Sequence, residues 1–246
     1  MLRSTDELEK SFRAVSKKSK KECANETEQI RKLSFLSGVF SASFYTFLKE
    51  NKGKIEPWGT CLCHVNLFEL IRTSGFILFL SINGLYRNAY DCIRHSLESL
   101  VQVIYIDSRH PDAPLETKIE ILKEIEDKRE YHVSHLIGEL RINHKDKLRS
   151  EYKELSRIIH PSHRQVIATI HDIKSKEKGA PIPTPIDCKE VSSIFESMRR
   201  MYDIFFFIIL EYYPELKEGL KKNAAFINSV KLYKLRLVSS LIGIKI

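Results

Sequence analysis

Residues 61–107 read CLCHVNLFELIRTSGFILFLSINGLYRNAYDCIRHSLESLVQVIYID and form the apolar centre of the sequence. No proline interrupts this stretch, and apolar residues recur in its second half at the three- and four-residue spacings of a helix. We expect two helices here, with a bend near Gly75 or Gly84. One helical face is predicted to be buried and carries Leu85, Ala89, Cys92, Ile93, Leu100, Val103 and Ile104.

The segments on both sides continue the helical pattern. The chain of 246 residues has only nine glycines and eight prolines, and the prolines separate long segments with helical periodicity. A β-sandwich or a barrel needs more turn residues, and no convincing strand is found. The sequence therefore predicts an all-α fold, a helical bundle of seven to nine helices.

The chain divides into four parts on this pattern. We expect a helical arm over 1–60, a helical core over 61–173 and a proline-rich loop over 174–187. Residues 188–246 are predicted to form C-terminal helices that pack on the core and end in a basic segment. Within these parts, helices are expected over 114–140, 143–159, 164–173, 187–213 and 224–241.

The positive charge is concentrated near the end of the chain. The net charge is +8, and residues 217–246 carry six of these eight charges. A basic tail of this kind can contact the phosphates of nucleic acid or of anionic lipid. The alternative is a solvated lysine-rich helix without a ligand. The predicted nucleic-acid contacts are Lys221, Lys222, Lys231, Lys234 and Arg236.

Cysteine usage and charge indicate a cytoplasmic protein. The five cysteines are odd in number and fit no disulfide framework, and the first 22 residues are charged throughout, unlike a secretory signal. The apolar run between Arg72 and Arg87 has 14 residues, shorter than the roughly 20 that a membrane-spanning helix needs. We therefore expect no transmembrane segment.

Metal and cofactor signatures are weak in this sequence. His132 and His135 are three residues apart, as are His160 and His163, so two helices could present four imidazoles to a metal. Residues 61–64, Cys-Leu-Cys-His, lack a second ligand cluster with matching spacing. Surface histidines and core thiols are the alternative, and no glycine-rich phosphate loop is present. No cofactor and no metal site are predicted.

A group of titratable residues surrounds a helix break near the middle of the chain. Residues 152–163 read YKELSRIIHPSH, and Pro161 disfavours helical dihedrals at His160. Arg157 can hold a phosphate, and a histidine can move protons near neutral pH. Cleavage of RNA by its own 2′-hydroxyl needs both functions. The alternative is a polar helix end whose side chains bond to freed carbonyls.

Two motifs resemble the HEPN superfamily of all-helical domains, found in toxins, antiphage systems and CRISPR-associated ribonucleases. The first is Arg-x-x-Leu-Glu at Arg94–Glu98 within residues 83–106, and the second is Tyr-x-x-Leu-Ser-x-x-x-His-Pro-Ser at 152–162. The resemblance covers about residues 62–173. The family's catalytic signature is an arginine followed by a histidine after four to six residues, and Arg157 and His163 have five residues between them.

This resemblance implies a metal-independent endoribonuclease that acts in defence or in a toxin–antitoxin pair. Arg157, His163 and His160 would be catalytic, with support from a second set of residues. RNA, a cognate antitoxin and other proteins are the implied partners. The alternative is a non-catalytic helical module that binds RNA or a protein, since Ile158 follows Arg157 where the family prefers a polar residue. The supporting residues are Arg94, Glu98, Tyr152, Ser156 and Ser162.

HEPN domains usually pair, so the resemblance also implies a homodimer. A charged stripe of Arg87, Asp91, Arg94 and Glu98 crosses the apolar stretch at three- and four-residue spacings. We expect the dimer interface to bury part of this stripe or the helix end at residues 157–163. The alternative is that the stripe faces solvent.

Overall fold

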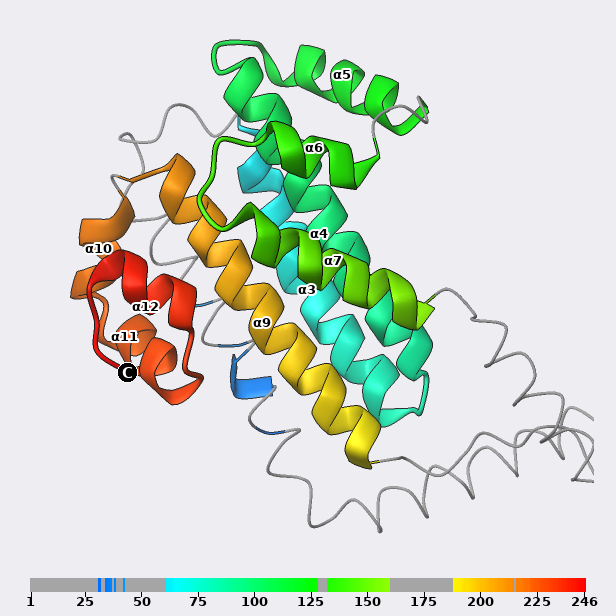
Figure 1. The fold of residues 1–246 in the computed structure, drawn as a ribbon, viewed down its shortest axis with the longest axis vertical. Helices are drawn as coiled ribbons and strands as arrows, with labels where there is room; N and C mark the ends of the chain where they lie inside the picture. Colours follow the sequence, from blue (N-terminus) through cyan, green and yellow to red (C-terminus); the bar gives the residue numbers. More distant parts are fainter. Residues whose placement is uncertain are drawn as a thin grey trace, which may run out of the picture.

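The computed structural model describes residues 61–127, 132–159, 188–214 and 216–246, with isolated positions between 31 and 42. Within these ranges it contains no strand, and the predicted all-α helical bundle is confirmed (Figure 1). Most of 1–60, the expected helix at 164–173 and the proline-rich loop lie outside the described residues. The described helices are α3 (Leu62–Ile82), α4 (Tyr86–Arg109), α5 (Leu115–Asp127), α6 (Val133–Glu139), α7 (Lys145–Ile159), α9 (Cys188–Tyr212), α10 (Leu216–Lys222), α11 (Ala224–Leu232) and α12 (Arg236–Ile242).

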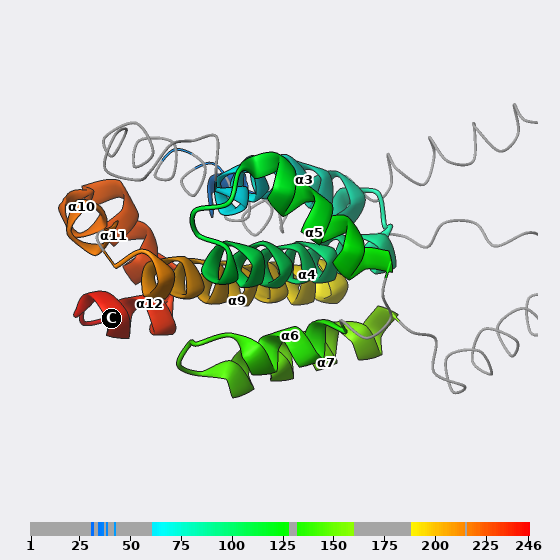
Figure 2. The same cartoon turned by 90° about the horizontal axis from the view of Figure 1, so that it is seen from above.

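Helix α4 is the centre of the bundle. It packs against α3, α5, α6, α7 and α9. Figure 2 shows α4 and α9 in a middle layer, with α3 on one side and α6 and α7 on the other. Because α4 is covered from several directions, it buries more than one face: Ile93 and Ile106 point in nearly opposite directions on the helix, and both are inaccessible to solvent. The apolar composition of this segment is what permits that position.

A tight turn at Gly84 joins α3 to α4. The backbone N–H of Leu85 donates to the Leu80 carbonyl at 2.9 Å, and that of Gly84 donates to the Ser81 carbonyl at 3.3 Å. This is a Schellman turn, whose left-handed position favours glycine, and Gly84 has a φ of 75° there. The expected bend is therefore at Gly84, whereas Gly75 lies within continuous helix.

The N-terminus of α3 is capped by a residue from the far end of α4. The Asp107 carboxylate accepts the backbone N–H groups of Leu62 at 3.2 Å and Cys63 at 2.9 Å. The Lys118 ammonium of α5 donates to the same carboxylate at 2.9 Å, with both side chains buried. Lys118 also donates to the Pro111 carbonyl at 3.3 Å. One buried ion pair therefore fixes three helices against one another.

Two expected helices are divided in the structure. The helix predicted over 114–140 consists of α5 and α6, which are separate helices. The helix predicted over 224–241 is interrupted at Tyr233–Leu235, where Lys234 has a left-handed φ of 50°. Here Leu235 donates to the Val230 carbonyl at 3.0 Å and Lys234 to the Lys231 carbonyl at 3.2 Å, a second Schellman turn. A lysine gives no sequence signal for this break.

Helix α3 is long and apolar enough to cross a membrane by length and composition, and within the described ranges it alone meets that test. The apolar run between Arg72 and Arg87 does not coincide with this helix, which begins at Leu62, ends at Ile82 and contains Arg72 paired with Glu69 at 3.1 Å. In the fold, 39% of the apolar window is buried. Core helices have the same composition, so one such helix is not a clear transmembrane segment.

We expect Asp107→Asn to lower the free energy of unfolding by about 3–5 kcal/mol, because it leaves the Lys118 ammonium buried without a charged partner. Urea denaturation measures this. The control is Glu69→Gln, which removes an exposed ion pair and should change the free energy by no more than about 1 kcal/mol. The double variant Asp107→Asn/Lys118→Met should recover part of the loss. Equal effects of Asp107→Asn and Glu69→Gln would contradict this account.

Candidate functional site

The two motif segments meet where α7 crosses α4. The Arg94 Nε donates to the Glu98 Oε1 at 2.8 Å, and the Tyr152 hydroxyl of α7 donates to the same oxygen at 3.0 Å. The Arg94 guanidinium also lies 5.9 Å from the centre of the Tyr152 ring. Burial, followed by the Glu98 charge, raises the pKa of Tyr152, so its hydroxyl keeps its proton and remains a donor. Ser156 lies beside this hydroxyl.

Part of the predicted charged stripe is covered by another helix of the same chain. The side chains of Arg94 and Glu98 are only 21% and 18% exposed because α7 covers them. Arg87 and Asp91, about two turns and one turn before Arg94 on α4, are exposed. The C-terminal half of the stripe is therefore closed to a partner copy. Only the half near the start of α4 is available to one.

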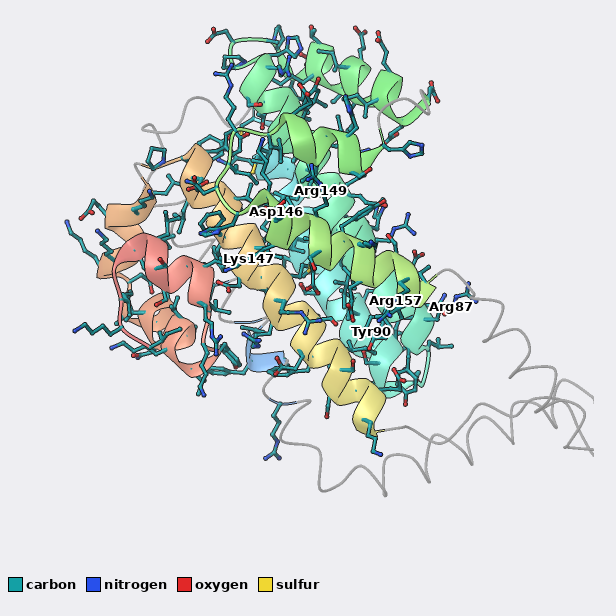
Figure 3. All side chains as sticks on the ribbon, in the orientation of Figure 1. Arg87, Tyr90, Asp146, Lys147, Arg149 and Arg157 are labelled. Carbon is teal, nitrogen blue, oxygen red and sulfur yellow. The ribbon has the colours of Figure 1, made fainter. Side chains whose placement is uncertain are left out.

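Arg157 is the one member of the predicted catalytic group that the structure describes. Its side chain is 77% exposed at the end of α7, 3.7 Å from the Glu154 carboxylate, and Figure 3 labels it. His160, Ser162 and His163 lie outside the described residues. That they form one site with Arg157 therefore remains a prediction. Arg157 itself is accessible to a ligand.

The basic end of the chain is built into the bundle. All five predicted contact residues are exposed, but they lie on α10, on α11, in the turn after α11 and on α12. The same helices contribute Phe226, Val230 and Val238 to the core. The basic residues therefore lie on helices that are part of the packed bundle, and truncation after Leu220 would remove part of the core.

A cleft of about 780 Å³ opens between α7, α9 and the turn that joins α11 to α12. Lys234 and Arg236 of the predicted contact set line it, whereas Lys221, Lys222 and Lys231 do not. The lining residues missed by the sequence analysis include Lys147 on α7 and Arg199 and Arg200 on α9. No local pattern could have identified these three, because the cleft joins segments that are far apart in the sequence.

The acidic groups of the cleft are occupied by internal contacts. Glu151 accepts the Arg200 Nε at 2.8 and 3.0 Å, and Glu196 accepts the Arg199 Nε at 2.8 Å. Asp203 accepts the backbone N–H groups of Leu237 at 3.1 Å and Val238 at 3.0 Å. Burial raises the pKa of Glu151 and of Asp203, while the arginine and the backbone donors act in the opposite direction.

Three basic residues of this cleft are not engaged by its carboxylates. Lys147, Lys234 and Arg236 are exposed and form no ion pair with any residue in the described part of the chain. Because the carboxylates of the lining are already engaged, the cleft is electropositive. It can accept an anion without first breaking an ion pair.

The Cys-Leu-Cys-His segment at the start of α3 is a buried polar cluster. The Cys61 thiol lies 3.3 Å from the Asp107 carboxylate and 3.2 Å from the Tyr213 hydroxyl. Burial, followed by the Asp107 charge, raises the pKa of Cys61 to about 11, and burial also raises the pKa of Cys63. Burial lowers the pKa of His64. Across the described ranges, no group of three histidine, cysteine or acidic residues is arranged to hold a metal.

No family model, curated protein or solved structure matches this chain significantly. The HEPN resemblance thus rests on the two motifs alone.

We expect Cys61 and Cys63 to resist iodoacetamide at pH 8 in the folded protein. With a pKa of about 11 for Cys61, roughly one thiol in a thousand is ionised at that pH, and both side chains are buried. Peptide mass spectrometry after timed labelling measures this. The control is the same labelling in urea, where both should react fully. Equal rates for Cys61 with and without urea would contradict the described environment.

Proposed function

We propose that this chain is a HEPN-like RNA-directed protein of the cytoplasm, acting as a metal-independent ribonuclease in defence or in a toxin–antitoxin system. The observation that carries the proposal is the contact between the two motif segments, where Tyr152 of the second donates to Glu98 of the first. These residues are 54 positions apart in the sequence. The contact holds α7 against α4 and fixes the helix from which Arg157 extends into solvent.

The proposed chemistry needs a proton carrier and a cation. His163, with His160 as the alternative, accepts the proton of a ribose 2′-hydroxyl as the 2′-oxygen attacks the neighbouring phosphorus. The bond from phosphorus to the 5′-oxygen breaks, that oxygen takes up a proton from water, and the histidine releases its own proton to solvent. Arg157 stabilises the extra negative charge on the phosphate oxygens. The products are a 2′,3′-cyclic phosphate and a 5′-hydroxyl.

The second candidate function is a non-catalytic module that binds RNA or a protein partner. The electropositive cleft favours it, because its lining offers cations to an anion but no histidine to move a proton. Binding without cleavage is the outcome that this candidate predicts. Where the ligand is RNA, the two functions differ only in whether the helix end near Arg157 cleaves it.

We expect purified protein to cleave single-stranded RNA in the presence of a chelator, and Arg157→Ala and His163→Ala to reduce the rate by about 10²–10⁴. Arg157→Lys should restore activity only partly, because lysine lacks the planar fork of arginine. The matched control is Arg149→Ala. Arg149 lies on the same helix, is exposed and has an acidic neighbour, Asp146, at the same 3.7 Å as the neighbour of Arg157 (Figure 3).

Loss of cleavage on addition of chelator, with no effect of His163→Ala, would end the metal-independent ribonuclease proposal. Equal effects of Arg149→Ala and Arg157→Ala would remove Arg157 from the site. RNA that is bound but left intact by every variant would leave the non-catalytic module as the function.

We also propose a homodimer that uses the exposed start of α4, where Arg87 and Asp91 lie, together with the Arg157 end of α7. Light scattering at micromolar concentration should give twice the monomer mass. Arg87→Glu should shift the protein toward monomer, whereas Arg72→Glu, an exposed change on α3, should not. A monomer for the wild-type chain would contradict this proposal.

A further inference from the structure

The cleft between α7, α9 and the α11–α12 turn combines a positive wall with an apolar one. Lys147 reaches it from α7, and Lys234 and Arg236 reach it from the turn and from the start of α12. Phe195 and Leu232 line the same cleft, and Leu232 is 61% exposed. A ligand that fits both walls carries an anionic group next to a flat apolar surface. The volume of the cleft, about 780 Å³, lies within the range of small-molecule sites.

Internal contacts hold the turn in place before any ligand arrives. The Arg199 guanidinium donates to the carbonyls of Tyr233 at 3.2 Å and Lys234 at 3.3 Å. The Asp203 carboxylate fixes the start of α12 by accepting the backbone N–H groups of Leu237 and Val238. The Phe195 and Tyr233 rings pack together with centroids 6.3 Å apart. The positions of the Lys234 and Arg236 backbones are therefore set by α9, so less order has to be gained on binding.

The residue at the left-handed position of the turn is unusual. Glycine is preferred there, and a lysine with a φ of 50° costs roughly 1–2 kcal/mol. The equivalent position of the α3–α4 turn is Gly84, which has no such cost. A side chain that works against local backbone preference, and that lines an electropositive cleft, is typical of a position with a role in binding.

We propose that this cleft binds a nucleotide phosphate, with Lys147, Lys234 and Arg236 on the phosphate and Phe195 and Leu232 against the base. The phosphate can belong to a free nucleotide or to single-stranded RNA. The RNA source rests on the proposed function, whereas the phosphate chemistry rests on the cleft alone. Aromatic and apolar side chains accept bases without regard to sequence, so the site reads phosphate and base together.

The test is a binding titration of two probes, uridine 5′-monophosphate by calorimetry and a 12-nucleotide oligouridine by fluorescence anisotropy. Lys147→Glu and Arg236→Glu should each weaken binding of both probes about tenfold or more, because one charged hydrogen bond is worth about that factor. Both positions lie in the first turn of a helix, where glutamate is favourable, so the fold should tolerate them.

The matched controls are Lys153→Glu, on the exposed face of α7, and Lys123→Glu, on the exposed face of α5. Both residues are exposed and neither lines the cleft. They should change affinity by less than about threefold. In the oligouridine titration, each cleft variant should also lower the salt slope by about 0.7 for every phosphate that the protein no longer neutralises.

Lys234→Gly separates binding from folding. It should raise the urea midpoint, because glycine suits the left-handed backbone, and at the same time weaken binding of both probes. A variant that is more stable and binds less cannot owe its loss of affinity to unfolding. Tight binding by Lys234→Gly would remove Lys234 from the site.

The outcomes test the proposed cleft site and the proposed RNA-directed function separately. Oligouridine binding that the cleft variants leave unchanged overturns the cleft and leaves the RNA-directed function standing. Monophosphate binding that the cleft variants abolish, with no binding or cleavage of RNA by wild-type protein, supports the cleft and overturns the RNA-directed function. Equal losses in cleft and control variants indicate nonspecific charge attraction and overturn the cleft, as does the absence of binding for both probes.

Discussion

The described arrangement of helices depends on the contacts of one buried group, the Asp107 carboxylate. It accepts two backbone N–H groups at the start of α3, pairs with the Lys118 ammonium of α5 and belongs itself to the end of α4. A helix start without a side-chain cap of its own leaves unsatisfied donors, and Cys61 provides no such cap. By satisfying them from another helix, Asp107 makes the local requirement of α3 a constraint on the whole bundle.

With α3 and α4 held as a pair, the opposite face of α4 is open to α7 and α9. There the Arg94 and Glu98 side chains turn toward Tyr152, and the motif residues become a contact within one chain. These residues therefore hold α7 against α4, which is the supporting role that the proposed ribonuclease requires of them. The chemistry proposed here belongs to the exposed end of α7, where Arg157 forms a solvent-exposed ion pair with Glu154 at 3.7 Å.

The C-terminal helices combine core packing with positive charge at the surface. Their apolar residues complete the core, and their cations are left at the surface because the nearby carboxylates are already bonded within the fold. The Asp203 carboxylate caps α12 from α9 in the way that Asp107 caps α3 from α4. Both caps cross between helices, so in each case a buried acid sets the position of a helix start and of the side chains that follow it.

The sequence by itself determined the helical class, a bend at either Gly75 or Gly84, and the extents of α7 and α9 to within a few residues. These features follow from apolar periodicity, from glycine and proline positions and from backbone preference, all of which act over a few residues. Only the tertiary structure decided that Arg94 and Glu98 are covered, that Lys234 takes a left-handed backbone and that Lys147 and Arg236 line the same cleft. The physical reason is that burial and electrostatic pairing depend on segments far apart in the sequence, whose approach is set by the packing of the whole bundle.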